Sequence, residues 1–218
     1  PRAADLVDVE VAVPVDLDGS GADFAVVCTY KYLCGGPGAA ALAFIRRDLQ
    51  DRDWPALPGW LGHGDRMNFV PDYQPAAGML SLVGGTMPVL QNVVTECAAR
   101  IWAGVDPSDV FAKHRSLSET LVRLLDEQCG RFGVALVTPA AYDRRGGHVA
   151  FRCPGGGPVC EALLDARVIG SFRQPDVIRF GLSAATLRHV DLWEAVSRLR
   201  TILAEERWRE PRFASVSV

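Results

Sequence analysis

The sequence has no apolar run long enough to cross a bilayer, and no signal peptide is visible. Its net charge is only -3 over 218 residues, so charge gives no reason to expect a nucleic acid or a membrane surface as a partner. It also contains no internal repeat and no low-complexity segment. These absences favour an ordinary globular chain.

The cysteines lack the paired spacings that are typical of metal or redox sites, so no metal site is expected. Several lie in apolar runs, and reduced cysteines in the core are the favoured interpretation, which indicates a cytoplasmic setting. The six positions are Cys28, Cys34, Cys97, Cys129, Cys153 and Cys160.

The length allows one large domain or two small ones with ample core. Apolar residues at helical spacing predict core-facing helices over about 88–103 and 107–129. After residue 130 the pattern changes to short strands, a short helix and a closing amphipathic helix. We therefore predict two α/β domains, residues 1–105 and 106–218. Strands are expected at 134–137, 149–153, 168–170 and 177–181, and helices at 158–166 and 191–208.

The most informative stretch is Ala-Asp-Phe-Ala-Val-Val-Cys-Thr-Tyr-Lys-Tyr-Leu-Cys-Gly-Gly-Pro-Gly, residues 22–38. Its apolar first part predicts a buried strand, and its glycine-rich end predicts a turn. Lys31 lies between them, beside a loop whose backbone can approach a ligand closely. Desolvation there would lower the pKa of the lysine and make it nucleophilic, as a Schiff-base lysine requires. A solvated lysine at a strand end is the simpler alternative.

Asp5 heads the apolar run 5–17, as a carboxylate at a strand end would. Enzymes that use pyridoxal 5'-phosphate pair a Schiff-base lysine with an aspartate on the pyridine nitrogen. Such an aspartate keeps the ring protonated, so that it can take up electrons. Taken alone, Asp5 would more simply be a solvated carboxylate.

Residues 5–38 resemble the kynureninases, a family with the aspartate aminotransferase fold. The family pattern is Asp-Leu-x-His-Ser-x-Gly-Ala-Val-Pro-Val-Asp-Leu, Gly-Ala-Asp-Phe-Ala and Cys-Thr-Tyr-Lys-Tyr-Leu-Asn-Gly-Gly-Pro-Gly, and it aligns here without a gap. The resemblance implies that Asp5 contacts the pyridine nitrogen and that Lys31 forms the Schiff base. It also implies that Tyr30 reaches the cofactor phosphate.

Four residues in this stretch depart from the family, since Val9 and Val11 replace a serine and a glycine and two more changes fall near the expected site. The histidine that lies close to the cofactor ring is replaced by Asp8, and the asparagine after Tyr-Lys-Tyr-Leu is replaced by Cys34. An acidic residue beside the ring would alter the local field and could change substrate choice.

Later segments resemble the same family. Gly-Trp-Leu-Gly-His, residues 59–63, corresponds to the family's Gly-Trp-Phe-Gly-His, whose tryptophan lies near the cofactor phosphate from the partner subunit. The resemblance therefore assigns Trp60 to the cofactor site and makes His63 a candidate for substrate contact, with a structural hydrogen bond as the alternative. Thr86 falls where the family places a hydroxyl or amide near the phosphate and the substrate. A cap on the following helix is the other possible role of Thr86.

The stretch 168–181 is the second strong match, and it contains Arg179 directly before Phe-Gly. An arginine that ends a strand before a glycine can present its planar fork to a carboxylate. By resemblance Arg179 binds the substrate carboxylate, and Arg173 is a weaker candidate. Downstream, the family's Pro-Leu-Tyr is replaced by Ala184-Ala185-Thr186.

The resemblance implies the second half of a fold-type-I pyridoxal-phosphate enzyme: the end of the large domain and a small C-terminal α/β domain. The implied reaction is hydrolysis of L-kynurenine, or a 3-hydroxy or related derivative, to an anthranilate and L-alanine. The first half would come from residues before Pro1 or from a separate polypeptide, unless the chain is a fragment. A homodimer or a heteromer is expected.

Two other functions stay open. One is a pyridoxal lyase or aminotransferase for a different amino acid, which the departures at Asp8 and Cys34 motivate. The other is a non-catalytic subunit or degenerate homologue, motivated by the absent first half.

Overall fold

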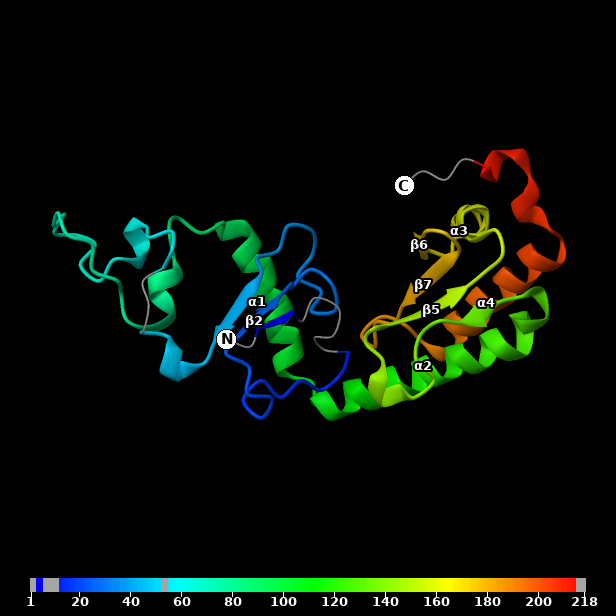
Figure 1. Ribbon diagram of the computed structural model, residues 1–218, viewed down its shortest axis with the longest axis horizontal. Coiled ribbons are helices and arrows are strands. Elements are labelled where there is room, and N and C mark those ends of the chain that lie inside the picture. Colours follow the sequence, from blue (N-terminus) through cyan, green and yellow to red (C-terminus); the bar gives the residue numbers. More distant parts are fainter. Residues whose placement is uncertain (1–2, 6–11, 52–54, 215–218) are drawn as a thin grey trace. The chain divides into compact units, whose positions relative to one another are not determined.

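The computed structural model of the protein describes residues 3–5, 12–51 and 55–214 (Figure 1). The chain divides into two compact units after Gly104, with residues 11–14 grouped with the second. Each unit has its own sheet.

The first unit is built on a three-stranded sheet in the order β1-β2-β3. β1 (Ala3–Asp5) and β2 (Phe24–Val27) are parallel, and β3 (Leu42–Ile45) is antiparallel to β2. The predicted strand after residue 22 is therefore confirmed, but it is buried on one side only. Ala25 is 2% exposed, whereas Val26 is 52% exposed.

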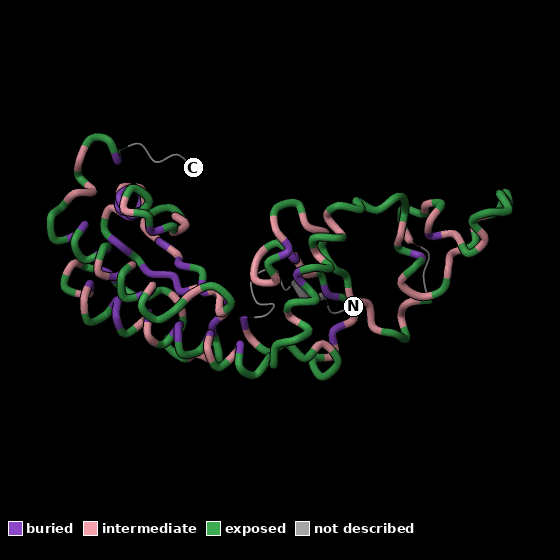
Figure 2. Tube along the Cα trace, turned by 180° about the vertical axis from the view of Figure 1, so that it is seen from behind, coloured by how far each residue is buried: buried purple, intermediate pink, exposed green. Residues whose placement is uncertain are grey.

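The helix α1 (Val89–Ala103) forms as its apolar spacing predicts. Its apolar stripe, however, is not core: Leu90 is 76% exposed and Ile101 is 71% exposed. In Figure 2 the tube of the first unit is mostly green and pink. No part of the described chain covers this stripe, because only Ala98 of α1 is buried.

The second unit contains an antiparallel sheet in the order β4-β5-β7-β6. The strands are β4 (Ala135–Leu136), β5 (His148–Arg152), β6 (Ser171–Arg173) and β7 (Val177–Gly181). In the two central strands, side chains alternate between faces, so Phe151 and Ile178 are fully buried while their neighbours Arg152 and Arg179 are not.

Three helices supply the rest of this core. They are α2 (Pro107–Cys129), α3 (Gly156–Asp165) and α4 (His189–Ala204), and α2 packs along α4 (Figure 1). The predicted α2 stripe is buried, with Leu117 and Leu121 at 0% exposure. The core therefore lies between one face of the sheet and these helices.

The structure corrects two local expectations in the second unit. Residues 168–170 are not a strand, and the strand forms instead as β6, three residues later, where it pairs with β7. The N-cap of α4 is Arg188, whose backbone N–H donates to Asp191 Oδ2 at 2.7 Å. Asp191, where the helix was expected to begin, is therefore its third residue, and its carboxylate reaches back to the chain before the helix.

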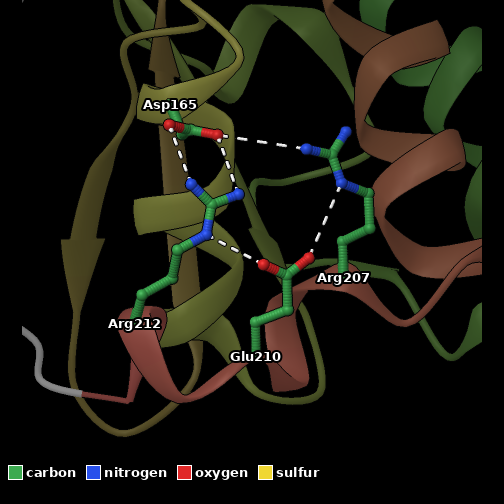
Figure 3. Close-up of polar contacts among 4 residues, drawn as sticks. All are labelled: Asp165, Arg207, Glu210 and Arg212. Atoms are coloured by element: carbon green, nitrogen blue, oxygen red, sulfur yellow. Dashed lines mark hydrogen bonds and ion pairs between the residues drawn. The ribbon is translucent and has the colours of Figure 1, made fainter.

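After α4, two short 3₁₀ turns, Arg207–Arg209 and Pro211–Phe213, return the chain to α3. Phe213 is buried in the core, and Trp208 packs against the core. Exposed ion pairs surround them: Arg212 contacts Asp165 at 3.3 Å and Glu210 at 2.8 Å, and Arg207 lies 4.0 Å from both carboxylates (Figure 3).

No helix within the described ranges is long and apolar enough to span a membrane. Over the same ranges, no group of three or more His, Cys, Asp and Glu side chains is arranged to hold a metal ion. Of the cysteines, Cys129 and Cys153 are buried as expected, whereas Cys34 and Cys97 are exposed, and none of the six forms a disulfide.

Candidate functional site

The two residues expected to hold the cofactor ring follow neighbouring parallel strands. β1 ends at Asp5, which lies opposite Val26 of β2. β2 ends at Val27, one residue beyond that pair. Lys31 follows four residues beyond that end. In α/β sheets, ligands bind outside the carboxyl ends of parallel strands, so the backbone brings both positions to the appropriate edge. The side chain of Asp5 and the whole of Asp8 lie outside what the structure describes.

The loop that carries Lys31 is closed by short polar contacts. The buried Thr29 hydroxyl donates to the Ala40 carbonyl at 2.6 Å, and Gly35 N–H donates to the Thr29 carbonyl at 2.8 Å. Trp102 of α1 donates its indole N–H to the Leu33 carbonyl at 3.0 Å. These bonds hold the lysine between a fixed strand and a fixed turn.

Lys31 is partly buried, and its Nζ atom lies 5.8 Å from the centre of the Tyr30 ring. The Tyr30 side chain is 51% exposed. An amine beside a phenol that remains accessible is suited to a reaction with a carbonyl compound that also carries an anionic group.

A second group of expected residues comes together in the long irregular segment before α1. A Cβ atom on Gly59 would lie 1.7 Å from the Gly84 carbonyl oxygen, so only glycine permits this close approach. The contact brings the segment that contains Trp60 alongside the segment that contains Thr86. Both side chains are exposed, Trp60 by 59%. Thr86 does not cap α1, because the N-cap is Pro88 and no side chain caps it.

Both ring nitrogens of His63 contact the backbone of its own loop. Nδ1 accepts from Asp65 N–H at 2.8 Å, and Nε2 lies 3.2 Å from both the Asp72 carbonyl oxygen and the Gln74 backbone nitrogen. Tyr73 packs edge-on against the ring at 5.3 Å. The structural role is thus present, and substrate contact by His63 stays a prediction.

Arg179 lies on the face of the sheet opposite the core, in the middle of β7. Its Nε donates to Ser171 Oγ at 3.1 Å, and its neighbour on the other side is the small Ala150. Within the described residues no carboxylate forms an ion pair with Arg179, whereas nearby Arg152 pairs with Asp176 at 3.0 Å. Its terminal nitrogens therefore keep donors for an anionic ligand.

The expected residues thus form three groups. Asp5, Tyr30 and Lys31 belong to the edge of the first sheet, and Trp60, His63 and Thr86 to the irregular segment of the same unit; Arg179 belongs to the second unit.

Sequence reasoning missed Thr29, Trp102 and Ser171, which fix the lysine loop and the arginine. Only Ser171 had a usable signal, because antiparallel pairing across a tight turn sets it opposite Arg179.

Comparisons with known proteins bear on the family and on the fold. Residues 110–199 match the family model described as the kynureninase C-terminal domain. The chain is 39% identical over 211 residues to a kynureninase from Burkholderia mallei (strain SAVP1), covering 97% of this chain and 51% of the relative. Over nearly its whole length this chain is similar to the kynureninases. The resemblance expected from its motifs is confirmed.

A kynureninase from Pseudomonas fluorescens is 36% identical over 209 residues, covering 96% of this chain and 50% of that relative. The chain therefore spans about half the length of the curated relatives it matches.

Solved structures agree on the fold. Cysteine desulfurase from Thermococcus onnurineus NA1 matches with a TM-score of 0.74 at 17% identity, over 93% of this chain and 52% of that chain. Alanine–glyoxylate aminotransferase from a Nostoc species matches with a TM-score of 0.69 at 20% identity, over 92% and 53%. A C-DES protein with glycine linked to its pyridoxal phosphate cofactor matches with a TM-score of 0.73 at 19% identity, over 88% of this chain and 49% of that chain. The α/β fold of pyridoxal-phosphate enzymes of fold type I is thus confirmed.

The residues of the first unit fit a pyridoxal phosphate group. An amine that can bind an aldehyde follows the carboxyl end of β2, next to the strand that ends in Asp5. The turn beyond it leaves open space, since a Cβ atom on Gly38 would meet nothing within 4 Å. An amine, a carboxylate, a phenol and hydroxyl groups are the donors and acceptors that such a cofactor requires.

Proposed function

We propose that this chain provides the second half of a kynureninase-like hydrolase, which cleaves L-kynurenine or a related derivative to an anthranilate and L-alanine. The observation that carries the proposal is Lys31, which follows β2 beside the parallel strand ending in Asp5, in a chain 39% identical to a kynureninase. The activity, the substrate and the cofactor pyridoxal 5'-phosphate belong to this proposal, because the matched relatives are about twice as long.

When bound, the cofactor would withdraw electrons from the α-carbon of an amino-acid substrate. Lys31 is the amine that would hold the cofactor aldehyde, and its free amine would serve as the base for the substrate α-proton. Asp5 would keep a proton on the pyridine nitrogen and Tyr30 would donate to the phosphate, and the resemblance assigns Asp8 to the neighbourhood of the ring.

The irregular segment would complete the site. The Gly59–Gly84 contact brings the segment that contains Trp60 beside the one that contains Thr86, and both residues are assigned to the cofactor phosphate across the subunit interface of a dimer. His63 is assigned to the substrate, and its ring would have to give up a backbone contact with Asp65, Asp72 or Gln74 for that role. Thr86 is also a candidate for substrate contact.

Arg179 binds the substrate carboxylate in this proposal. Because Ser171 already accepts from Nε, the two terminal nitrogens form the edge that would meet both carboxylate oxygens. This donor edge favours substrates that carry a carboxylate.

The cofactor assignment is testable by chemical trapping. The chain contains only two lysines, Lys31 and Lys113. Pyridoxal 5'-phosphate is added, the adduct is reduced with borohydride, and the labelled peptide is identified by mass spectrometry. We expect the label on Lys31. Lys31→Ala should abolish it, while Lys113→Ala, whose ammonium group donates to the Ala184 carbonyl, should leave it unchanged. Label on Lys113 alone would contradict the assignment.

The reaction requires the complete enzyme. We propose an assembly, either a homodimer or a heteromer with a chain that supplies the first half, in a cytoplasmic setting. Native mass spectrometry of protein purified from its own host gives its composition, and anthranilate fluorescence gives the activity with kynurenine. Cofactor binding without kynurenine cleavage would favour a lyase or aminotransferase. No cofactor in the complete assembly would favour a non-catalytic homologue.

A further inference from the structure

The second unit contains a hollow between α2 and the β4 edge of its sheet. Its volume is about 610 Å³, which is within the range typical of small-molecule sites. Its lining residues come from α2, β4, β5 and the segment before β5. They are Glu119, Val122, Arg123, Leu125, Asp126, Val134, Ala135, Leu136, Arg145 and Phe151.

The walls of this hollow, which we call the α2–β4 cavity, are mainly apolar. Leu125, Val134 and Phe151 belong to the buried core, and Val122 and Leu136 stand partly open to solvent. An apolar ligand body could therefore gain contact with fixed core side chains without rearranging them.

One charged side chain in the wall of the cavity, Arg145, is buried. Arg145 is 8% exposed and lines the cavity. Its Nε donates to the Pro139 carbonyl at 2.7 Å, Nη1 to the Ser118 hydroxyl at 3.1 Å, and Nη2 to the Ala140 carbonyl. All three acceptors are uncharged, and a guanidinium has five N–H groups, so two donors remain.

The acids around the cavity do not neutralise this charge. The Glu119 carboxylate is 2.9 Å from Nε of Arg115, and that pair is exposed. Asp126 and Arg123 are exposed at the rim, where their opposite charges balance in solvent. Among the described residues no carboxylate forms an ion pair with Arg145. A buried cation without a counter-charge is costly, and an anion that brings its own charge into the cavity would relieve that cost.

We propose that the α2–β4 cavity binds a small monocarboxylate with an apolar body, such as an aromatic acid. The carboxylate meets the remaining N–H groups of Arg145, and the apolar body lies against Val122, Leu136 and Phe151. This site is independent of the reaction proposed above.

The test uses benzoate as the probe and benzamide as its neutral analogue. Two-dimensional NMR of the labelled full chain follows amide shifts and the Nε–H resonance of Arg145 during each titration. We expect saturable shifts with benzoate at about millimolar affinity or better, confined to residues around the cavity, and a response to benzamide at least about tenfold weaker. Equal responses to the two probes would overturn the proposal, as would no shift at 50 mM benzoate, which is roughly fifty times the expected dissociation constant.

Two substitutions localise the site. Val122→Trp fills the cavity and should weaken benzoate binding by about tenfold or more, whereas Leu164→Trp, at an exposed position of α3, should not. Arg145→Gln removes the charge and should abolish the preference for benzoate over benzamide. Because Arg145 also donates to the backbone carbonyls of residues 139 and 140, circular dichroism checks that Arg145→Gln still folds. If Arg145→Gln unfolds, the effect of Val122→Trp on benzoate binding is the test of the site.

A third substitution separates this site from the proposed substrate site. Arg179→Ala should leave benzoate binding to the cavity unchanged. If Arg179→Ala removes the benzoate shifts while Val122→Trp keeps them, the carboxylate site is the one at Arg179 and the cavity proposal is wrong.

Discussion

Cys34 is strained in a way that its family position explains. Its φ is 60°, in the left-handed region where asparagine and glycine are the usual residues. The kynureninase pattern has asparagine here. We expect Cys34→Asn to raise the free energy of unfolding of the first unit by about 1 kcal/mol, because asparagine tolerates this backbone better. Urea unfolding measures the change. Cys97→Asn, at an exposed helical position, is the control and should not stabilise the protein.

Position 155 requires glycine because of its backbone conformation and because a side chain has no room there. Its φ is 68°, and a Cβ atom there would lie 2.5 Å from the Trp208 ring. We expect Gly155→Ala to destabilise the second unit by about 2–4 kcal/mol, the sum of backbone strain and overpacking. Gly130→Ala is the matched control, because Gly130 is in right-handed helical geometry with no atom closer than 3.8 Å. A loss of stability in the control as large as in Gly155→Ala would contradict this explanation.

His114 should make the stability of the second unit depend on pH. It is fully buried, its Nδ1 lies 2.9 Å from the Tyr142 hydroxyl, and Arg115 stacks on that tyrosine while Arg145 lies near it. Burial lowers the pKa of His114 below its ordinary value of 6.5, and the Gly147 backbone offsets only part of this. Between the two pKa values the unfolded chain binds a proton that the folded chain does not.

The free energy of unfolding should therefore fall as the pH drops below about 6.5 and level off below the folded pKa. Chemical denaturation at several pH values measures this slope. His114→Phe should reduce it, and His189→Gln, at an exposed position, should not. An unchanged slope in His114→Phe would remove His114 as its origin.

At the scale of elements, the segment after α4 is held by its apolar side chains more than by its ion pairs. Asp165, Arg207, Glu210 and Arg212 are about half exposed, and such pairs contribute little in water (Figure 3). We expect Asp165→Asn to cost under about 1 kcal/mol. Phe213→Ala should cost about 3 kcal/mol, because it empties a buried position. Thermal unfolding at low and high salt measures the loss of stability in both variants. A larger loss in Asp165→Asn than in Phe213→Ala would contradict this ranking.

The sequence predicted elements well where one face of the element is buried within the chain. The α2 stripe and the strands β5 and β7 are confirmed, because both kinds of element follow from a local apolar pattern. The α1 stripe has the same periodicity, yet it is exposed. Periodicity identifies which face is apolar, but not whether anything covers it. The displaced strand at 171–173 shows a second limit, since strand pairing with β7 decided its position.

Much of the candidate site was also readable from sequence. The order of strand, lysine and glycine-rich turn predicted where Lys31 lies. The Thr29 and Trp102 contacts were not predictable, because hydrogen bonds between distant segments leave no local pattern. Likewise, nothing in the sequence signalled that Gly59 and Gly84 touch.

At the scale of the whole molecule, the two units differ in how much they bury. The central hydrophobic cluster consists of second-unit residues, whereas the first unit has few buried side chains (Figure 2). We expect amides of β5, β7, α2 and α4 to exchange with deuterium more slowly than those of β2, β3 and α1, because protection follows buried contacts. Hydrogen exchange with mass spectrometry measures this. Equal protection in the two units would mean that they open as one.

The short outer strands of the second sheet have a consequence for self-association. β4 has two residues and β6 has three, so the sheet offers few unpaired backbone groups to another chain. Long, flat edges are the usual templates for aggregation, and very short edge strands prevent such pairing. Any aggregation of this protein should therefore begin at the exposed apolar stripe of α1 and not by strand addition to β4 or β6.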